Sequence, residues 1–187
     1  MEFAARSPSV IAAYDPRWPA LFLDAAARMR DELGAVACRI DHIGSTAVPG
    51  LAAKPVIDIQ ISVASLEPLE AYRNPLERLG YVYRAANTDR SKRYFRETPE
   101  TQRMHVHVRR QGSWGEQFAL LFRDYLRMHP EAAARYADVK QDLARQFAPQ
   151  GDWDAYTEAK GPCIWAIVME ATSWSQATGW EPGPPDG

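Results

Sequence analysis

The stretch that most constrains the fold of this chain is "VIDIQISV", residues 56–63. It is rich in β-branched residues and nearly continuously apolar, which is typical of a strand buried on both faces of a sheet. One carboxylate, Asp58, interrupts the run. Because a buried and unpaired carboxylate is costly, we expect a cation or a hydrogen-bond donor to lie beside Asp58.

The composition is that of an ordinary soluble globular protein. The chain has 187 residues, of which 46% are hydrophobic and 25% are charged, and this length is enough to bury a core. Its 22 basic and 24 acidic side chains give a formal net charge of -2, so no overall field favours nucleic acid or an anionic membrane. We expect neither of these as a partner, and we expect a monomer or a homodimer.

The cysteines and the first residues indicate a cytoplasmic protein. Cys38 and Cys163 each lie in an apolar stretch, which predicts two buried thiols rather than a disulfide framework or a zinc site. The N-terminal residues lack the pattern of an export signal, and no segment approaches 18 apolar residues.

The periodicity of apolar residues divides the chain into unlike halves. In residues 1–112 it predicts an α/β core with helices at 15–33 and 65–80, and with strands at 36–43, 56–63, 81–86, 92–97 and 104–110. From Ser113 the period becomes 3.6, which predicts a helical subdomain over 113–176 packed on the core. The Gly/Pro-rich residues 177–187 are predicted to form a flexible tail.

A turn-rich loop precedes the central strand and predicts a phosphate site. Gly44 has no Cβ and can adopt a positive φ, so that the backbone at Gly44, Ser45 and Thr46 can approach a ligand with its N–H groups and hydroxyls. Asp58 and Gln60 then share one face of the following strand. A carboxylate beside a phosphate-binding loop is how phosphoryl and nucleotidyl transfer enzymes hold a divalent metal.

Three stretches together carry a resemblance to a known family. They are "HIGSTAVPGLAAKPVIDI", "HVHV" and "LLFRDYLRMHPEAAARYADVK". With them the chain, from about Tyr14 to Ile167, resembles the GrpB family, whose fold belongs to the nucleotidyltransferase superfamily of the DNA polymerase beta type. Members of this family are sometimes fused to dephospho-coenzyme A kinase. The resemblance implies a nucleotidyltransferase-like mixed β-sheet with flanking helices, and Gly44 and Ser45 resemble the pair that binds a triphosphate.

The resemblance also implies positions for a metal. The first metal-binding aspartate of the superfamily falls on Asp58, and its second carboxylate falls on Gln60, a neutral amide that offers one oxygen and no charge. A third acidic residue would fall near His105 and His107, and imidazoles suit manganese or zinc better than magnesium. We expect Asp58, Gln60 and His107 as metal ligands, with His42 close by in the same pocket.

Several basic and aromatic side chains are expected to bind the nucleotide. Tyrosine and lysine stand one helical turn apart twice in the helical half, so each pair shares a helix face. The candidate residues are Lys54, Arg93, Tyr136, Lys140, Tyr156 and Lys160. Arg123 and Asp124 are expected to form a structural ion pair.

The predicted function is metal-assisted transfer of a nucleotidyl group from a nucleoside triphosphate such as ATP to a small acceptor. Asp58 would hold the metal, magnesium or manganese first and zinc second, and His105 or His107 would act as the base. Two alternatives stay open. One is a module that binds a nucleotide or a coenzyme A fragment without catalysis; the other is a transition-metal enzyme built on His42, Asp58, His105 and His107.

Overall fold

A five-stranded mixed β-sheet forms the centre of the computed structural model, which describes residues 11–98 and 102–187. The strand order is β1-β2-β5-β4-β3. The strands are β1 (Arg39–Ile43), β2 (Ile57–Val63), β3 (Tyr81–Tyr83), β4 (Lys92–Glu97) and β5 (Met104–Arg110). β2 and β5 are parallel and the other neighbours are antiparallel. The predicted α/β sheet is therefore confirmed, with β2 inside it.

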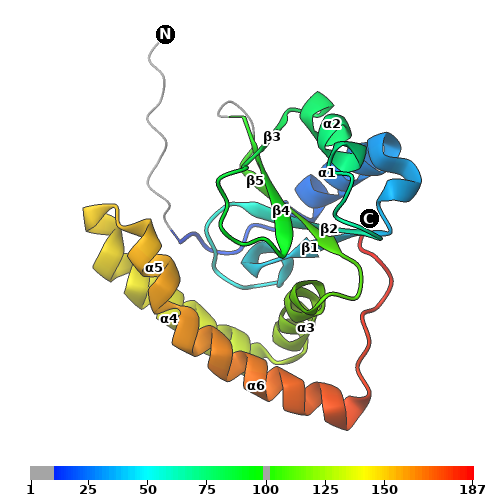
Figure 1. Ribbon diagram of the computed structural model, residues 1–187. Coiled ribbons are helices and arrows are strands. Elements are labelled where there is room, and N and C mark those ends of the chain that lie inside the picture. The colour runs from blue at the N-terminus through cyan, green and yellow to red at the C-terminus, as the bar shows by residue number, and fades with distance from the viewer. Residues whose placement is uncertain (1–10, 99–101) are drawn as a thin grey trace.

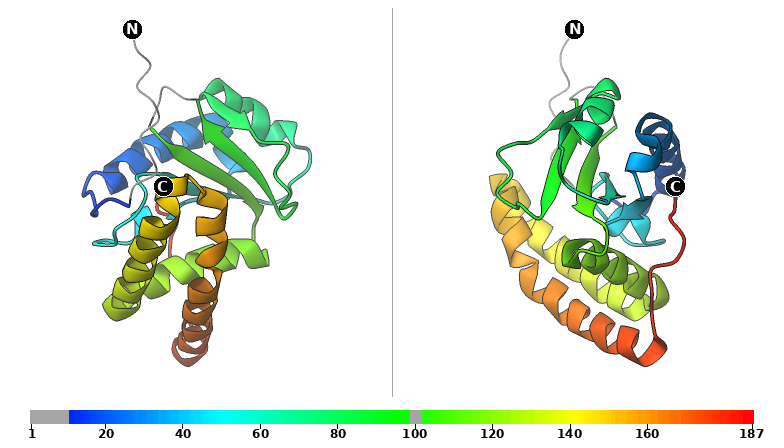
Figure 2. Two further views of the ribbon diagram at one scale, coloured as in Figure 1. Left: turned by 90° about the vertical axis from the view of Figure 1, so that its left-hand side faces the viewer. Right: turned by 45° about the vertical axis from the view of Figure 1, so that its right-hand side comes forward.

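Two helices cover one face of this sheet. They are α1 (Trp18–Leu33) and α2 (Glu70–Arg78), and Figures 1 and 2 show both on the same side of the strands. Ile57, Ile59 and Ile61 of β2 point into the core beneath them. Because side chains of a strand alternate, Asp58 and Gln60 point to the opposite face.

The helical half covers the opposite face. Its helices are α3 (Trp114–Met128), α4 (Pro130–Phe147), α5 (Trp153–Ala159) and α6 (Gly161–Thr178). Short 3-10 turns lie at Gly34–Val36, Ser45–Ala47 and Ala148–Gln150. A second hydrophobic core joins α3, α4 and α6 to Val48 and Leu51 of the loop after β1. Figure 2 shows α3 between the sheet and the longer helices.

The last residues of the chain depart from the sequence prediction. Where the sequence predicts a flexible tail, residues 179–187 run back from α6 to β1, as Figure 1 shows in red. The backbone N–H of Gly187 donates to the carbonyl of Ile40 at 3.1 Å, and the N–H of His42 donates to Asp186 at 3.1 Å. The physical reason is that β1 lies at the edge of the sheet, and its outward backbone groups need partners.

Cys38 also departs from its predicted environment. It is exposed, and Cys163 is half-buried, so the prediction of two buried thiols is wrong. The predicted strand at 36–43 begins only at Arg39, because Gly34–Val36 forms a 3-10 turn that places Cys38 outside the sheet.

Two further expectations concern the whole chain. None of the helices in the described part of the chain is long and apolar enough to cross a membrane. The division at residue 112 stays a prediction, and residues 1–10 of the first predicted domain lie outside the described residues.

Candidate functional site

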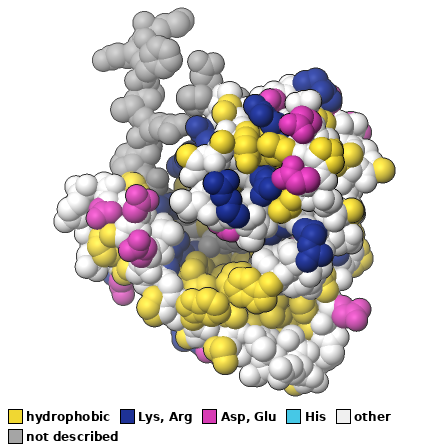
Figure 3. Space-filling view, viewed as in Figure 1, with side chains coloured by type: hydrophobic (Ala, Val, Ile, Leu, Met, Phe, Trp, Pro, Cys, Tyr) yellow, Lys and Arg dark blue, Asp and Glu magenta, His cyan; other side chains and the backbone are white. Residues whose placement is uncertain are grey.

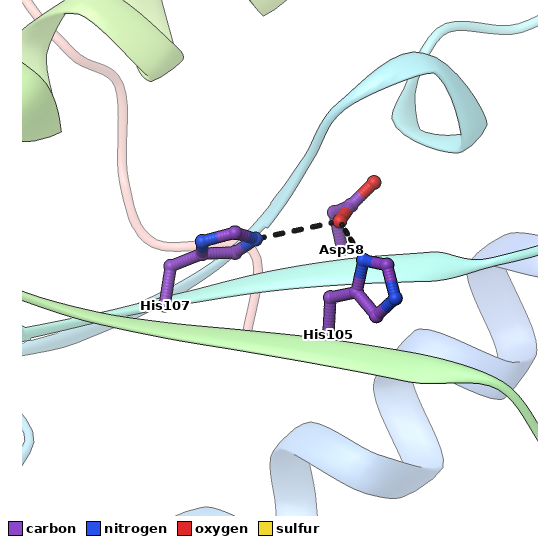
Figure 4. Close-up of side chains that lie close together, drawn as sticks. All are labelled: Asp58, His105 and His107. Atoms are coloured by element: carbon purple, nitrogen blue, oxygen red, sulfur yellow. Dashed lines mark hydrogen bonds and ion pairs between the residues drawn. The ribbon is translucent and has the colours of Figure 1, made fainter. Parts of the chain in front are cut away.

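One aspartate and two histidines meet on the face of the sheet opposite α1. The parallel register of β2 and β5 places Asp58 beside His105 and Gln60 beside His107. Nδ1 of His105 lies 3.3 Å and Nε2 of His107 lies 3.4 Å from the same oxygen, Oδ1 of Asp58. Figure 4 shows both rings turned toward this carboxylate. The partner that the sequence predicts for Asp58 is therefore a pair of imidazoles.

The electrostatics of this cluster favour an ionised Asp58. Burial alone would raise the pKa of Asp58, but hydrogen bonds and charge from His105 and His107 outweigh it and hold the pKa well below 3.8. Burial lowers the pKa of His107, and Asp58 only partly offsets this effect. At neutral pH the cluster thus combines a carboxylate with a neutral imidazole at His107.

Only glycine fits at position 44, because the backbone there lies close to the side chain of Asp58. Its backbone has φ 72° and ψ −171°, a combination that is essentially restricted to glycine. A Cβ on Gly44 would lie 2.6 Å from Oδ2 of Asp58. The loop after β1 therefore brings its backbone directly against the carboxylate.

A cavity of about 440 Å³ lies in front of this cluster. It joins the sheet to the loop after β1 and to helices α4 and α5. Nine residues that the sequence analysis selects line it: Ser45, Thr46, Lys54, Asp58, His105, His107, Lys140, Tyr156 and Lys160. The topology thus gathers most of the predicted phosphate, metal and cationic residues around one space, but not Gln60, Arg93 or Tyr136.

Three lysines of this cavity have no acidic partner within the part of the chain that the structure describes. Among the described residues no carboxylate lies within 4.0 Å of Lys54, Lys140 or Lys160. Nζ of Lys54 lies 3.8 Å from the ring centroid of Trp153 and 4.2 Å from that of Tyr156. Such a concentration of unpaired positive charge indicates a site for an anion.

The pKa values of these lysines reflect the same crowding. Burial and then repulsion from Lys160 lower the pKa of Lys54 to about 8 and that of Lys140 to about 7. Burial also lowers the pKa of Lys160, although Asp58 opposes this shift. Nζ of Lys140 donates to the carbonyl of Ala52 at 2.5 Å, which fixes the ammonium at the cavity wall.

Tyr136 lies behind the cavity wall rather than in it. It is buried, and Nζ of Lys140 lies 4.6 Å from its ring centroid. Burial raises the pKa of Tyr136, and the side chain of Ser45 partly offsets the rise. Tyr136 therefore supports Lys140 and Ser45 of the loop after β1 from outside the cavity. The second predicted pair differs, because Tyr156 and Lys160 both line the cavity.

His42 does not join the Asp58 cluster, contrary to the prediction. It points to the α1 face, where its ring stacks on Phe22 with centroids 4.8 Å apart. Its Nε2 lies 3.0 Å from Oγ1 of Thr46, which donates its own proton to the carbonyl of Val56, so His42 is the donor. Burial lowers the pKa of His42 to about 4. Its neutral ring holds Thr46 in place and does not reach the cavity.

Arg93 also lies on the wrong face for the predicted role. It forms an ion pair with Glu67 at 2.7 Å on the side of Phe95, whose ring is in the core under α2. Its neighbours Lys92 and Tyr94 point to the site face instead. The ring of Tyr94 lies 5.1 Å from that of His107. The sequence analysis did not select Lys92 and Tyr94. Because side chains alternate along a strand, counting from the buried Phe95 would have placed both on the site face.

Gln60 is fully buried beneath α3. Its amide nitrogen donates to the backbone carbonyl of Glu116 at 3.3 Å, and its Oε1 has no hydrogen-bond partner among the described residues. Arg123 and Asp124 form the predicted ion pair at 2.7 Å. Arg123 also donates to the carbonyl of His42, so that it fixes α3 to β1.

The donor set at Asp58 fits a divalent metal. One oxygen of Asp58 and one ring nitrogen each of His105 and His107 lie within 4.8 Å of one another. The other ring nitrogens, Nε2 of His105 and Nδ1 of His107, have no hydrogen-bond partner among the described residues. Two imidazoles and one carboxylate suit manganese, zinc or iron, whereas magnesium prefers oxygen ligands alone.

Solved structures place this fold in a known class. The poly(U) polymerase Cid1, solved with MgGTP, matches 73% of this chain and 44% of that chain, with a TM-score of 0.51 and 15% sequence identity. This likeness shows the fold alone. Together with the mixed sheet and its flanking helices, it makes the fold nucleotidyltransferase-like.

The particular family follows from closer matches. The GrpB protein family model matches residues 8–170, and the chain belongs to this family. The crystal structure of the conserved protein GrpB from Enterococcus faecalis covers 88% of this chain and 99% of that chain, with 32% identity and a TM-score of 0.79. A dephospho-CoA kinase of Mycolicibacterium paratuberculosis is 38% identical over 95% of this chain, which spans 49% of that protein. The chain thus spans about half the length of this curated relative.

Proposed function

We propose that this protein transfers a nucleotidyl group from a nucleoside triphosphate to a small acceptor, with a divalent metal at Asp58. The observation that carries the proposal is the cavity in which Lys54, Lys140 and Lys160, without acidic partners, face the Asp58 cluster. A triphosphate supplies the negative charge that these lysines lack.

The loop after β1 positions the triphosphate in this proposal. Gly44 lets the backbone approach the phosphates, and Ser45 and Thr46 line the same cavity, although the hydroxyl of Thr46 is bonded to His42 and Val56. Lys140 of α4 and Lys160, which follows α5, line this cavity too and neutralise the β- and γ-phosphates. The ring of Tyr156 is buried, with Nζ of Lys54 at 4.2 Å and Nζ of Lys160 at 4.6 Å from its centroid, so it positions these two ammonium groups for the phosphates.

The transfer itself needs a base near Asp58. An oxygen of the acceptor hydroxyl forms a bond to the α-phosphorus as the bond from that phosphorus to the bridging oxygen breaks, and pyrophosphate leaves. The hydroxyl proton passes to an imidazole. The imidazole that does not hold the metal accepts it, because a metal-bound ring nitrogen has no lone pair free for a proton. His105, whose Nδ1 lies 3.3 Å from Oδ1 of Asp58, is the base when His107 holds the metal, and His107 is the base when His105 holds it.

A metal held by Asp58 and one of the two histidines would supply positive charge to the phosphate oxygens during transfer, while the other histidine accepts the proton. The donor set favours manganese or zinc over magnesium for this role. Asp58 stays ionised for it because both histidines stabilise the charged carboxylate.

Calorimetric titration tests the proposal. The protein is titrated with each of the four nucleoside triphosphates in the presence of Mg²⁺, Mn²⁺, Zn²⁺ or a chelator. We expect metal-dependent binding of at least one triphosphate that Asp58→Asn weakens more than about tenfold. The control is Asp24→Asn, which changes an exposed carboxylate on α1. Absence of binding for all four triphosphates would overturn the proposal.

A second candidate is a binding module without catalysis. Gln60 favours it, because its amide is committed to α3 and adds no charge beside Asp58. The ligand in this case is a nucleotide or a coenzyme A fragment, in keeping with the name of the dephospho-CoA kinase relative. Release of pyrophosphate in the presence of a mixture of hydroxyl and amine acceptors distinguishes the two functions, since the module binds without turnover.

A further inference from the structure

The site face of the sheet continues beyond His107 into a second basic region. Along β5 the side chains of His105, His107 and Arg109 share this face, and Lys92 of β4 pairs with Arg109 in the antiparallel register. Tyr94 lies between the two regions, with Nζ of Lys92 at 5.4 Å from its ring centroid. The Asp58 cluster therefore has lysines of the cavity on one side and Lys92 and Arg109 on the other.

Arg109 forms no direct ion pair with a described residue, and Asp89 compensates its charge only from a distance, through Ser91. Among the described residues no carboxylate lies within 4.0 Å of its guanidinium, and its buried Nε has no hydrogen-bond partner. Its Nη1 donates to Oγ of Ser91 at 3.4 Å. Lys92 is only partly compensated, by Asp89 at 3.7 Å. The Oγ of Ser91 donates its own proton to Asp89 at 2.6 Å. Two cations against this one carboxylate leave a net positive charge, which suits an anion such as a phosphate monoester.

An exposed aromatic cluster adjoins this basic region. The guanidinium of Arg109 packs against the backbone of Gly115, where an added Cβ would lie 3.0 Å from its Cζ. Trp114, which precedes Gly115, is 68% exposed, and Trp165 of α6 is 54% exposed. The two indoles are nearly parallel with centroids 6.2 Å apart, and Phe118 lies 4.9 Å from Trp114. Figure 3 shows hydrophobic side chains gathered over α3 and α6, below the basic side chains of the sheet.

We propose that this region binds the acceptor, and that the acceptor is a phosphate monoester carried on a planar ring. Arg109 and Lys92 bind its phosphate, and Trp114 and Trp165 bind its ring by stacking. This inference rests on the proposed function. Its geometric support is that in-line transfer requires the acceptor to attack from the side opposite the leaving pyrophosphate. Since the lysine cavity takes the polyphosphate, the side of β4 and β5 is left for the acceptor.

The test uses nucleoside monophosphates as the simplest compounds of this class. The protein is saturated with a non-hydrolysable triphosphate analogue and metal, and then titrated with AMP, GMP, CMP or UMP, followed by calorimetry and tryptophan fluorescence. Adenosine and inorganic phosphate are titrated separately. We expect at least one monophosphate to bind about tenfold more tightly than either fragment and to quench the fluorescence.

Variants separate this site from the triphosphate site. Arg109→Gln is expected to weaken the monophosphate about tenfold or more and to leave the triphosphate affinity within about twofold. Trp114→Leu is expected to weaken the monophosphate and to remove most of the quenching. The matched control is Arg110→Gln, because Arg110 is the next arginine of β5 and is exposed at the strand end.

The outcomes are distinguishable. If the wild-type protein binds the triphosphate but no monophosphate, or if Arg109→Gln and Arg110→Gln behave alike, the acceptor site is overturned and the proposed function stands. If no triphosphate binds at all, the proposed function fails and this inference fails with it.

Discussion

At the scale of single residues, the backbone of Gly44 leaves no room for a side chain between the loop after β1 and the carboxylate of Asp58. We expect Gly44→Ala to lower the free energy of unfolding by about 1–3 kcal/mol, because its φ and ψ exclude a side chain. The displaced carboxylate of Asp58 should also lose metal affinity, since the new Cβ would lie 2.6 Å from Oδ2. Denaturant unfolding and metal titration measure the two effects.

Gly50→Ala is the matched control for Gly44→Ala. Gly50 has a positive φ of 78°, but a Cβ there would have no atom within 4 Å. We expect a loss of stability without a loss of metal affinity. Equal metal affinities for the Gly44→Ala and wild-type proteins would show that the loop does not position Asp58.

The lowered pKa of Lys140 predicts that stability and triphosphate affinity change in opposite directions with pH. Its folded pKa of about 7 lies below the usual 10.5, so between these values the unfolded chain binds more protons and the group's contribution to stability rises with pH. The affinity for a triphosphate should instead fall as pH rises through 7, because the ammonium loses its charge. Calorimetry and unfolding from about pH 6 to 9 measure both.

Lys140→Met tests the origin of this dependence. In the variant the fall in affinity should move toward pH 8, where Lys54 titrates. A triphosphate affinity of the wild-type protein that stays constant over the whole range would contradict the assignment of Lys140 to the phosphates.

At the scale of elements, the alternation of β4 decides which cation reaches the site. We expect Lys92→Gln to weaken binding of the monophosphate several-fold, because Lys92 shares the face of Tyr94 and Arg109. Arg93→Gln should leave the affinities for triphosphate and monophosphate unchanged, since its guanidinium is paired with Glu67 on the other face. The two variants differ by one position, so equal effects would mean that the register of β4 is wrong.

The strands were largely predictable and the faces of their side chains were less so. β4 and β5 have the predicted bounds, because short alternating stretches bounded by turns specify strands. One step along a strand moves a side chain to the other face of the sheet. An error of one residue in the alternation therefore places His42 or Arg93 on the wrong face. The shared face of His105 and His107 could be predicted, because the apolar Val106 between them points into the core.

At the scale of the whole molecule, two cores meet at the loop after β1. Its residues Val48 and Leu51 belong to the core of α3, α4 and α6, while Ala53 belongs to the core of α1 and the sheet. The sequence predicts that the helical half packs on the core but not which residues make the contact, because amphipathic faces do not specify their partners. The consequence is that the cavity has one wall from each half of the protein, with Asp58 from the sheet and Lys140 from α4.

The return of the tail to β1 yields the last prediction, which concerns stability. Asp186 accepts hydrogen bonds from the N–H of His42 at 3.1 Å and from Arg123 at 2.6 Å, and Arg123 is only 3% exposed. Asp186→Ala leaves a buried guanidinium with fewer partners, so the free energy of unfolding should fall by about 1–3 kcal/mol. Glu181→Ala, an exposed change in the same tail, should stay within about 0.5 kcal/mol of the wild-type value. Denaturant unfolding of both variants measures these free energies. Equal stabilities of the Asp186→Ala and Glu181→Ala variants would mean that the tail does not hold α3 against the edge of the sheet.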